Sequence, residues 1–316
     1  MSKSIMHIEK DVDHRTNVRD DLRSDIADYY DQSYWDYRTS WLNSKNLAIH
    51  YGYWADDTQT HSDSLLKMNE VLAGQLELKP GDHVLDAGCG IGGSSIWLAE
   101  NFGVKVTGIT ISPTQIEQAV KNAKKRGVEQ LVDFKLEDYT QTSFEDETFD
   151  HVWGLESVCY ALKKSDFIKE AHRVLKKGGC FAVADGFANK RDVTPKEWKY
   201  VLKVLNGWAM PNMSTPTEFE SFMTGSGFTD IYYRDITNNT LPSSKRLYYT
   251  ALLTYPMEKV MSVLGLRSSV QSGNFDACFG QYHVLHDGIG CYGLFSAKKS
   301  VSISTLTLFY EVTIKA

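Results

Sequence analysis

The chain has 316 residues, 42% hydrophobic and 23% charged, and a net charge of −6, which suits one α/β core plus an insertion of subdomain size. The acidic balance argues against a nucleic-acid-binding surface, which needs a basic stripe, and no apolar run reaches the length of a membrane span. Five cysteines without a CxxC pair, and His283 and His286 without further ligands nearby, predict a cytoplasmic protein with free thiols and no metal site.

The first part of the chain, residues 1–78, is predicted to form a helical lead and a lid. Residues 1–22 are polar, lack an apolar period and are expected to be mobile. Residues 25–47 predict a helix dense in aromatic side chains, and residues 61–78 predict an amphipathic helix that ends at a Lys-Pro-Gly breaker. The aromatic residues of the first helix are Tyr29, Tyr30, Tyr34, Trp35, Tyr37 and Trp41. Their rings can pack on the core, cover a ligand, or do both.

Short apolar runs alternate with helical patterns over residues 79–236. The expected strands are 83–86, 105–109, 132–136, 149–153, 180–184 and 228–236. Such an alternation favours an α/β fold, in which helices cover both faces of a parallel sheet and ligands bind outside the carboxyl ends of the strands. A helical insertion is expected near residues 190–216.

The rest of the chain divides into three parts. Residues 237–290 are too many for a structureless loop and predict a helical cap with aromatic side chains of its own. Residues 291–299 predict the last strand of the core. No role is predicted for the tail, residues 300–316.

A glycine-rich turn lies within the sequence DHVLDAGCGIGGSSIWLA, residues 82–99, between a predicted strand and a predicted helix. Glycines at this junction let the backbone turn sharply and approach a ligand at a helix N-terminus. Gly88, Gly90 and Gly93 also fit the G-x-G-x-x-G pattern of dinucleotide-binding proteins, which alone is a weak signal. Asp86 would repel a pyrophosphate but suits a ligand with amino and sulfonium charges, and no acid follows the second strand to bind an NAD ribose. The turn therefore favours S-adenosylmethionine over NAD, although a merely structural turn stays an alternative.

The stretch VLDAGCGIGG resembles motif I of the Rossmann-like class I methyltransferases. Further matches are YYDQSY (29–34), HYGYW (50–54), GITIS (108–112), FDHVWGLESVCYA (149–161), HRVLKKGG (172–179) and CYGLF (291–295). Together they cover residues 29–299 and resemble a small-molecule branch. This branch includes tocopherol, sterol and prenyl C-methyltransferases, some alkaloid and glycine-type N-methyltransferases and, more distantly, cyclopropane fatty acid synthases. The resemblance implies a Rossmann-like, seven-stranded, mostly parallel sheet with a helical cap, and S-adenosyl-L-methionine as the cofactor, with S-adenosyl-L-homocysteine as product.

The resemblance also implies a set of cofactor-binding residues. Tyr30 and the HYGYW segment would approach the methionine end, Thr110 and Gln115 would bond the ribose, and Asp138 and Tyr139 would meet the adenine. An exposed acidic turn is the alternative role for Asp138. The expected cofactor contacts are Tyr30, Asp86, Gly88, Cys89, Gly90, Thr110, Ile111, Gln115, Asp138, Tyr139 and Leu155.

Glu156 follows the fourth predicted strand, where this fold places groups that face the substrate. In the resembled C-methyltransferases this acid faces the acceptor, and a histidine often stands four positions later; here that position is Tyr160. We expect Glu156 and Tyr160 to be the catalytic residues. With an alkene acceptor, Glu156 would stabilise a cation or remove a proton, and with an amine it would bind or deprotonate the ammonium.

The predicted function is methyl transfer to a small, largely apolar acceptor, with C-methylation of a prenyl, terpenoid or sterol-like molecule favoured. The alternatives are N- or O-methylation of an alkaloid-like or other natural product, and a non-catalytic methyltransferase-like binding protein. We expect the aromatic segments 25–54 and 240–285 to meet over the sheet and close an apolar pocket that faces Glu156. The sequence is compatible with a homo-oligomer but does not identify the acceptor.

Overall fold

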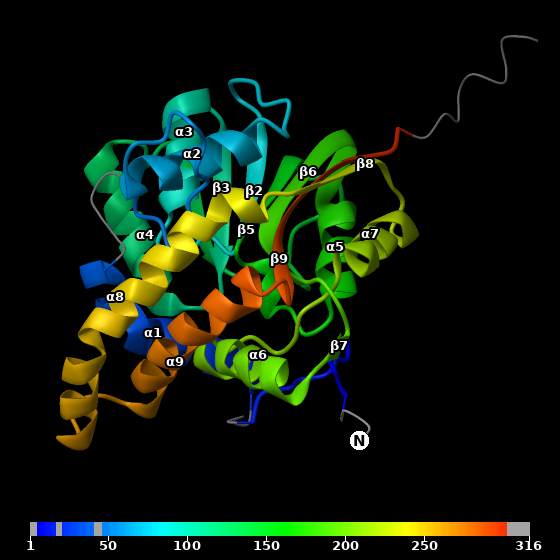
Figure 1. Cartoon of the computed structure of the whole chain (residues 1–316). Coiled ribbons are helices and arrows are strands. Elements are labelled where there is room, and N and C mark those ends of the chain that lie inside the picture. Colours follow the sequence, from blue (N-terminus) through cyan, green and yellow to red (C-terminus); the bar gives the residue numbers. More distant parts are fainter. Residues whose placement is uncertain (1–4, 17–20, 41–45, 302–316) are drawn as a thin grey trace, which may run out of the picture.

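The computed structural model describes residues 5–16, 21–40 and 46–301 of the chain (Figure 1). Its centre is a seven-stranded sheet with the strand order β4-β3-β2-β5-β6-β9-β8, in which β9 runs antiparallel to β6 and β8. The other neighbouring pairs are parallel, which confirms the predicted mostly parallel α/β sheet. The strands are β2 (His83–Ala87), β3 (Lys105–Thr110), β4 (Val132–Leu136), β5 (Phe149–Leu155), β6 (Leu175–Ala188), β8 (Phe228–Asp235) and β9 (Gly290–Lys299).

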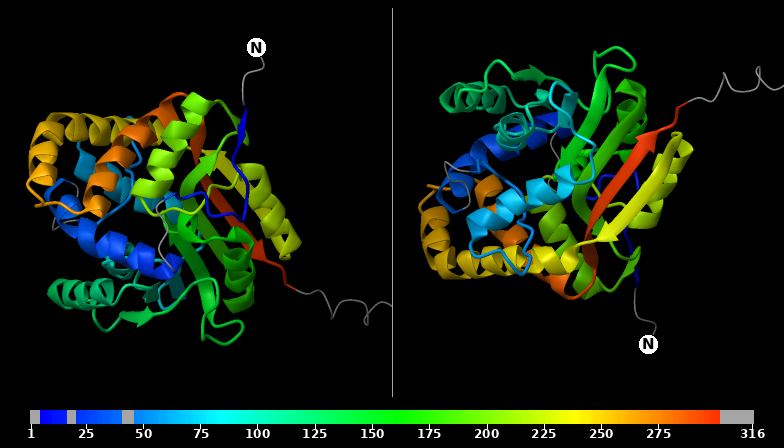
Figure 2. Two further views of the ribbon diagram at one scale, coloured as in Figure 1. Left: turned by 90° about the horizontal axis from the view of Figure 1, so that it is seen from below. Right: turned by 90° about the horizontal axis from the view of Figure 1, so that it is seen from above.

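Helices cover both faces of this sheet, because its strands are apolar on both sides (Figure 2). Phe181 packs in a cluster with α5 (Lys164–Val174) and α7 (Pro216–Gly225). The next residue, Ala182, packs in the opposite cluster with α2 (His61–Ala73) and α3 (Gly93–Phe102). A fifth helix, α4 (Pro113–Arg126), joins α3 on that second face.

Four helices from distant parts of the chain gather at one end of the sheet (Figure 1). They are α1 (Leu22–Ser40), α6 (Pro195–Gly207), α8 (Thr237–Val263) and α9 (Ser269–His286). Helix α9 contacts each of the other three. Helices α8 and α9 lie within residues 237–290, where a helical cap is predicted, and α8 begins at the first residue of that range, Thr237. These four helices therefore form a layer over the strand ends, where α/β proteins bind their ligands.

The N-terminal segment corrects one prediction. Residues 5–16 are neither mobile nor helical, because β1 (Met6–His7) pairs antiparallel with β7 (Asp192–Val193). Ile8 is fully buried beside α6. The prediction was wrong because one buried isoleucine and a two-residue strand produce no periodic pattern, and their partner lies far along the chain. Trp41 and most of the 300–316 tail lie outside the described residues.

Candidate active site

The glycine-rich turn connects β2 to α3 at the centre of the sheet. Because β2 pairs with β3 on one side and β5 on the other, the turn lies where the strand order reverses. Gly88 has a φ of +94°, and a Cβ added there would lie 2.3 Å from the Cβ of Ser157. Gly90 has a φ of +54°, but a Cβ added there would have no atom within 4 Å. Gly88 thus permits close packing of two turns, whereas Gly90 faces open space.

A cavity of about 370 Å³ lies over this turn. Every residue expected from the sequence to contact the cofactor lines it: Tyr30, Asp86, Gly88, Cys89, Gly90, Thr110, Ile111, Gln115, Asp138, Tyr139 and Leu155. The structure therefore brings together residues from α1, β2, β3, β5 and the loop after β4 at one site. The backbone of the glycine-rich turn forms one wall of this cavity.

The polar groups of this first cavity are buried and hydrogen-bonded. The Ser95 hydroxyl donates a hydrogen bond of 2.6 Å to Asp86, whose pKa is raised to about 6 by burial. A bound ammonium or sulfonium group would favour the ionised form of this carboxylate. The Thr110 hydroxyl donates to Oε1 of Gln115 over 2.6 Å, so the two residues expected at the ribose are held together.

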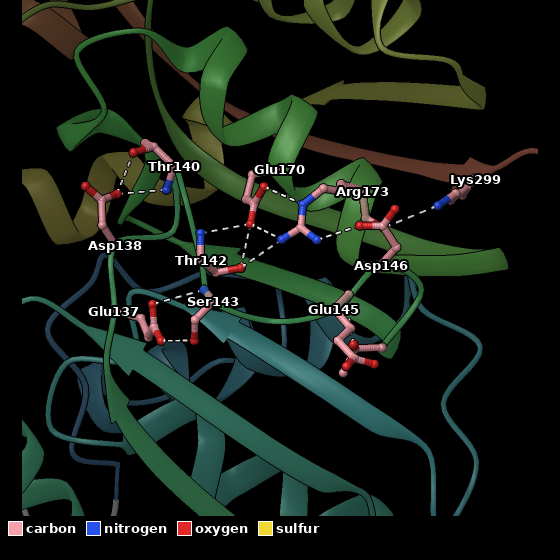
Figure 3. Close-up of polar contacts among 11 residues, drawn as sticks. Glu137, Asp138, Thr140, Thr142, Ser143, Glu145, Asp146, Glu170, Arg173 and Lys299 are labelled. Carbon is pink, nitrogen blue, oxygen red and sulfur yellow. Dashed lines mark hydrogen bonds and ion pairs between the residues drawn. The ribbon is translucent and has the colours of Figure 1, made fainter.

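Asp138 lies in the loop that follows β4, at the rim of the first cavity. One carboxylate oxygen accepts hydrogen bonds from the backbone N–H and the hydroxyl of Thr140, at 2.8 and 2.6 Å (Figure 3). The other oxygen pairs with Arg23 of α1, at 2.7 Å. Asp138 is therefore fixed by its own loop and also holds α1 over the cavity.

The loop that carries Asp138 is anchored to α5 (Figure 3). Arg173 binds Glu170 at 2.6 Å and Asp146 at 2.7 Å, and Glu170 accepts the backbone N–H of Thr142 at 2.8 Å. These contacts connect the middle and the last part of the loop to one helix. The position of Asp138 is thus set by α5 as well as by the sheet.

Glu156 lies directly after β5, with a φ of +48° that is uncommon for a residue with a side chain. Its Oε1 accepts hydrogen bonds of 2.6 Å from the backbone N–H of Tyr51 and from the hydroxyl of Tyr292. The pKa of Glu156 is raised to about 8, mainly by burial and to a smaller extent by the nearby Asp185, against the lowering effect of the two hydrogen bonds. Glu156 is consequently protonated for much of the time at neutral pH when no charged ligand is nearby.

Tyr160 ends the short 3-10 helix η1 (Val158–Tyr160), and its hydroxyl accepts a hydrogen bond of 2.9 Å from Tyr30 of α1. Burial raises the pKa of both phenols well above the ordinary value, so both stay neutral. The buried Lys164 ammonium donates to the backbone carbonyls of Cys159 and Ala161, at 2.9 and 2.7 Å. Lys164 therefore fixes the turn that presents Tyr160.

A second cavity, of about 330 Å³, adjoins the first. Both are lined by Tyr30, Ile49, His50, Glu156 and Tyr160. Most of the remaining apolar and aromatic lining comes from α1, α6, α8, α9 and the segments near them, and Tyr292 is added from β9. These residues are Tyr37, Tyr51, Val204, Trp208, Met210, Met213, Leu247, Ala251, Met257, Met261, Phe275, Val284, Leu285 and Tyr292. The aromatic segments near residues 25–54 and 240–285 thus do meet over the sheet, and they enclose a largely apolar space beside Glu156.

Polar groups also line the second cavity, on the side of α8 and α9. Glu258 is 3% exposed, and its carboxylate oxygens have no hydrogen-bond partner among the described residues. Arg267 binds Asp36 of α1 through two hydrogen bonds of 3.0 and 2.7 Å. This part of the cavity can therefore receive a polar group of a mostly apolar ligand.

Helix α1 covers both cavities. Besides the Arg23–Asp138 and Asp36–Arg267 ion pairs, Asp31 accepts hydrogen bonds of 3.1 Å from the hydroxyls of Ser112 and Thr114 at the start of α4. Polar contacts thus anchor the helix near its beginning, its middle and its end.

The sequence did not single out several residues that the structure places at this site. Tyr51 and Tyr292 bind Glu156, and each lies in a motif noted for the family resemblance, so a signal existed. His50 lines both cavities, and burial lowers its pKa to about 4, so its ring is neutral at physiological pH. Asp31 also lies in such a motif, YYDQSY, whereas Arg23 lies in a charged stretch without any motif, and no pattern could have identified it.

A sheet of this strand order, with a glycine-rich turn at its centre, is the Rossmann-like fold of class I methyltransferases. Residues 85–183 match the family described as "Methyltransferase domain". The chain thus contains a methyltransferase domain, and the relatives below that it resembles are named as methyltransferases.

Three relatives give the extent of the similarity. The methyltransferase GfsG of Streptomyces halstedii is 33% identical over 168 residues, 52% of this chain and 59% of that protein. The 27-O-demethylrifamycin SV methyltransferase of Amycolatopsis mediterranei (strain S699) is 39% identical over 137 residues, 43% of this chain and 50% of that protein. The 2-methyl-6-phytyl-1,4-hydroquinone methyltransferase of Synechocystis is 35% identical over 207 residues, 62% and 64% of the two chains. The matches thus span 50% to 64% of the length of these relatives.

Solved structures share the fold at lower identity. The cyclopropane synthase MmaA2 of Mycobacterium tuberculosis superimposes with a TM-score of 0.76 at 16% identity, covering 88% of this chain and 98% of that one. The geranyl diphosphate C-methyltransferase of Streptomyces coelicolor A3(2) has a TM-score of 0.67 at 21% identity, with 88% and 97% covered.

Proposed function

We propose that this protein transfers a methyl group from S-adenosyl-L-methionine to a small, largely apolar acceptor in the second cavity. The observation that carries the proposal is that the two cavities adjoin at Glu156 and Tyr160. A donor over the glycine turn and an acceptor among the aromatic side chains would face each other there. Methyl transfer depends mainly on such positioning and on the exclusion of water.

The first cavity fits the cofactor in its polar groups as well as its place in the fold. Asp86 offers a buried carboxylate to a cationic end, and Asp138 offers acceptor oxygens at the opposite rim. Thr110 and Gln115 offer a hydroxyl and an amide to a ribose between them. When bound, the cofactor would supply an electrophilic methyl group carried on a sulfonium.

Glu156 is suited to the charge that methylation creates on the acceptor. A methylated alkene or aromatic carbon becomes cationic and must lose a proton. A positive charge already beside Glu156 before the transfer, as a bound sulfonium group would bring, lowers the pKa of its carboxyl group, which then releases its own proton to water. The ionised carboxylate can then stabilise this cation and accept the proton. The neutral rings of Tyr30 and Tyr160 present additional negative faces to the cation.

Carbon methylation of a prenyl, terpenoid or sterol-like acceptor is the reaction that we favour. The apolar lining of the second cavity and the phytyl hydroquinone in the name of one relative support it. O-Methylation is the main alternative, because another relative is named for a 27-O-demethyl substrate. Glu156 would then deprotonate a hydroxyl or hold it for attack.

Product analysis with a labelled methyl donor tests the proposal. The purified protein is incubated with methyl-deuterated S-adenosylmethionine and a panel of prenylated hydroquinones, terpenoids, sterols and macrolactones, and mass spectrometry identifies the labelled product. NMR then distinguishes a new carbon–carbon bond from a methyl ether. Glu156→Gln should lower turnover roughly a hundredfold and keep S-adenosylhomocysteine affinity, whereas Glu220→Gln, at an exposed position on α7, should change neither. Cofactor binding without a labelled product from any acceptor class would instead support a binding protein.

A further inference from the structure

Helix α8 carries an exposed apolar face. The side chains at positions 249, 252, 253, 257, 260, 263 and 264 follow the spacing of a single helical face and are between 49% and 87% exposed. We call this set the outer stripe; it consists of Tyr249, Leu252, Leu253, Met257, Val260, Val263 and Leu264. The acidic residue of the same region, Glu258, is instead buried toward the second cavity. The helix therefore presents apolar side chains to the outside and buries its carboxylate.

The outer stripe is extensive. It spans 15 residues of helix, about 22 Å, and Leu266, 64% exposed, continues it into the turn before α9. The ends of α8 and α9 project beyond the sheet and its flanking helices (Figure 1). No described part of the chain covers the stripe, and a continuous exposed apolar surface of this kind marks an interaction site.

The charges beside the outer stripe indicate what covers it. Lys245, Arg246 and Lys259 are exposed, and they are positive in a chain whose net charge is −6. Lys259 lies 3.8 Å from the carboxylate of Glu258, so Lys245 and Arg246 carry most of this argument. A surface that combines apolar groups with negative charge would complement this face, as the interface of an anionic lipid layer does. A second copy of the chain, paired symmetrically along the stripe, would instead bring like charges together.

The outer stripe also reaches the second cavity. Met257 belongs to the stripe, is 68% exposed and lines that cavity together with Thr254 and Met261 of the same helix. A protein partner on the outer stripe would cover the edge of the cavity that these residues form. A lipid layer would instead leave a continuous apolar path from the lipid to the cavity. An apolar acceptor dissolved in lipid could follow that path without crossing water.

We infer that the outer stripe of α8 docks on an anionic lipid surface and that the acceptor enters the second cavity from that surface. None of the described helices combines the length and apolar character of a bilayer span, so α8 would lie along the surface. The docking does not depend on the reaction; the access route for the acceptor rests on the proposed function.

Vesicle flotation of the full chain tests the docking. We expect binding to vesicles of phosphatidylcholine that contain phosphatidylglycerol, weaker binding to phosphatidylcholine alone, and loss of the difference at high salt. The double substitution Leu253→Glu and Val263→Glu should weaken binding roughly tenfold or more, because carboxylates would replace apolar contacts with the lipid. Neither position lines the second cavity.

The matched control is Val120→Glu with Tyr232→Glu, two apolar positions on α4 and β8 that are about half exposed and lie outside the stripe, which should leave vesicle binding unchanged. Retained affinity for S-adenosylhomocysteine shows that each variant is folded and keeps this test separate from that of the reaction. Absence of vesicle binding by the unmodified chain, or equal losses in both double variants, would overturn the inference. A stripe-dependent dimer in solution without vesicle binding would overturn it in favour of a second copy.

Discussion

Replacing Glu156 by glutamine should stabilise the protein without ligands, and more strongly at neutral pH than at acid pH. Glu156 is partly buried and accepts hydrogen bonds from Tyr51 and Tyr292, and the amide oxygen of glutamine can accept the same two bonds. The substitution therefore preserves the shape and the polar contacts but removes the group that must ionise as the pH rises. Any change in stability that depends on pH then reports the ionisation of this carboxyl group.

The magnitude follows from the two pKa values of this group. Its ordinary pKa is 4.5, and burial in the folded protein raises it to about 8. Because the folded value is the higher one, the stability that Glu156 contributes is complete below about pH 4.5 and is lost as the pH rises through about 8. Each pH unit in this window is equivalent to about 1.4 kcal/mol. Between about pH 5 and about pH 7 the expected loss is roughly 2 to 3 kcal/mol.

Urea unfolding of both proteins at the two pH values measures this difference. The stability of the glutamine variant relative to the original chain should increase by roughly 2 to 3 kcal/mol from about pH 5 to about pH 7. Glu220→Gln, at an exposed position, should show no such increase. A Glu156→Gln effect that is the same at both pH values would refute the raised pKa and, with it, the argument for Glu156 as a proton acceptor.

Three further substitutions test other parts of the site. Gly90→Ala should weaken S-adenosylhomocysteine binding roughly tenfold or more in calorimetry. Gly127→Ala should not weaken it, although Gly127 also has a positive φ and open space around an added Cβ. Equal effects of the two substitutions would mean that only backbone strain is measured. Asp31→Ala removes the acceptor of the Ser112 and Thr114 hydroxyls, which costs about 1 kcal/mol of the interaction between α1 and α4. We therefore expect several-fold faster dissociation of S-adenosylhomocysteine in stopped-flow measurements. An unchanged rate would show that this contact does not hold α1 over the cavity. Lys164→Met leaves buried carbonyl groups without a donor and should lower the free energy of unfolding by roughly 2 kcal/mol or more; unchanged stability in urea would contradict that role.

The sheet could be predicted because its strands are local features of the sequence. The strand predicted at residues 132–136 is β4 with the same bounds. The strand predicted at residues 180–184 is longer in the structure, where β6 spans Leu175–Ala188. Its additional residues include the polar Lys-Lys-Gly-Gly segment, which has no strand pattern. The extension depends on pairing with β5 and β9, which a local pattern does not record.

The candidate site shows the same division between local and distant contacts. The glycine turn and Glu156 were identified because each lies at the end of a predicted strand with its characteristic neighbours. The Tyr292 hydroxyl reaches Glu156 from β9, 136 positions further along the chain, and Arg23 reaches Asp138 from the helix above. Such contacts depend on how α1 and β9 pack against the sheet, which the local sequence does not show. Tyr292 could be recognised only through its motif, and Arg23 could not be recognised at all.

Helix α1 has a consequence for the kinetics of the protein. It contributes Ile26 to the lining of the first cavity, Tyr37 to that of the second and Tyr30 to both. A movement that releases this helix from its attachments would therefore uncover both cavities in one step. The residence times of the two ligands are then coupled, and their release would share one activation barrier. Turnover limited by that step would vary little among acceptors of different reactivity and would respond to solvent viscosity.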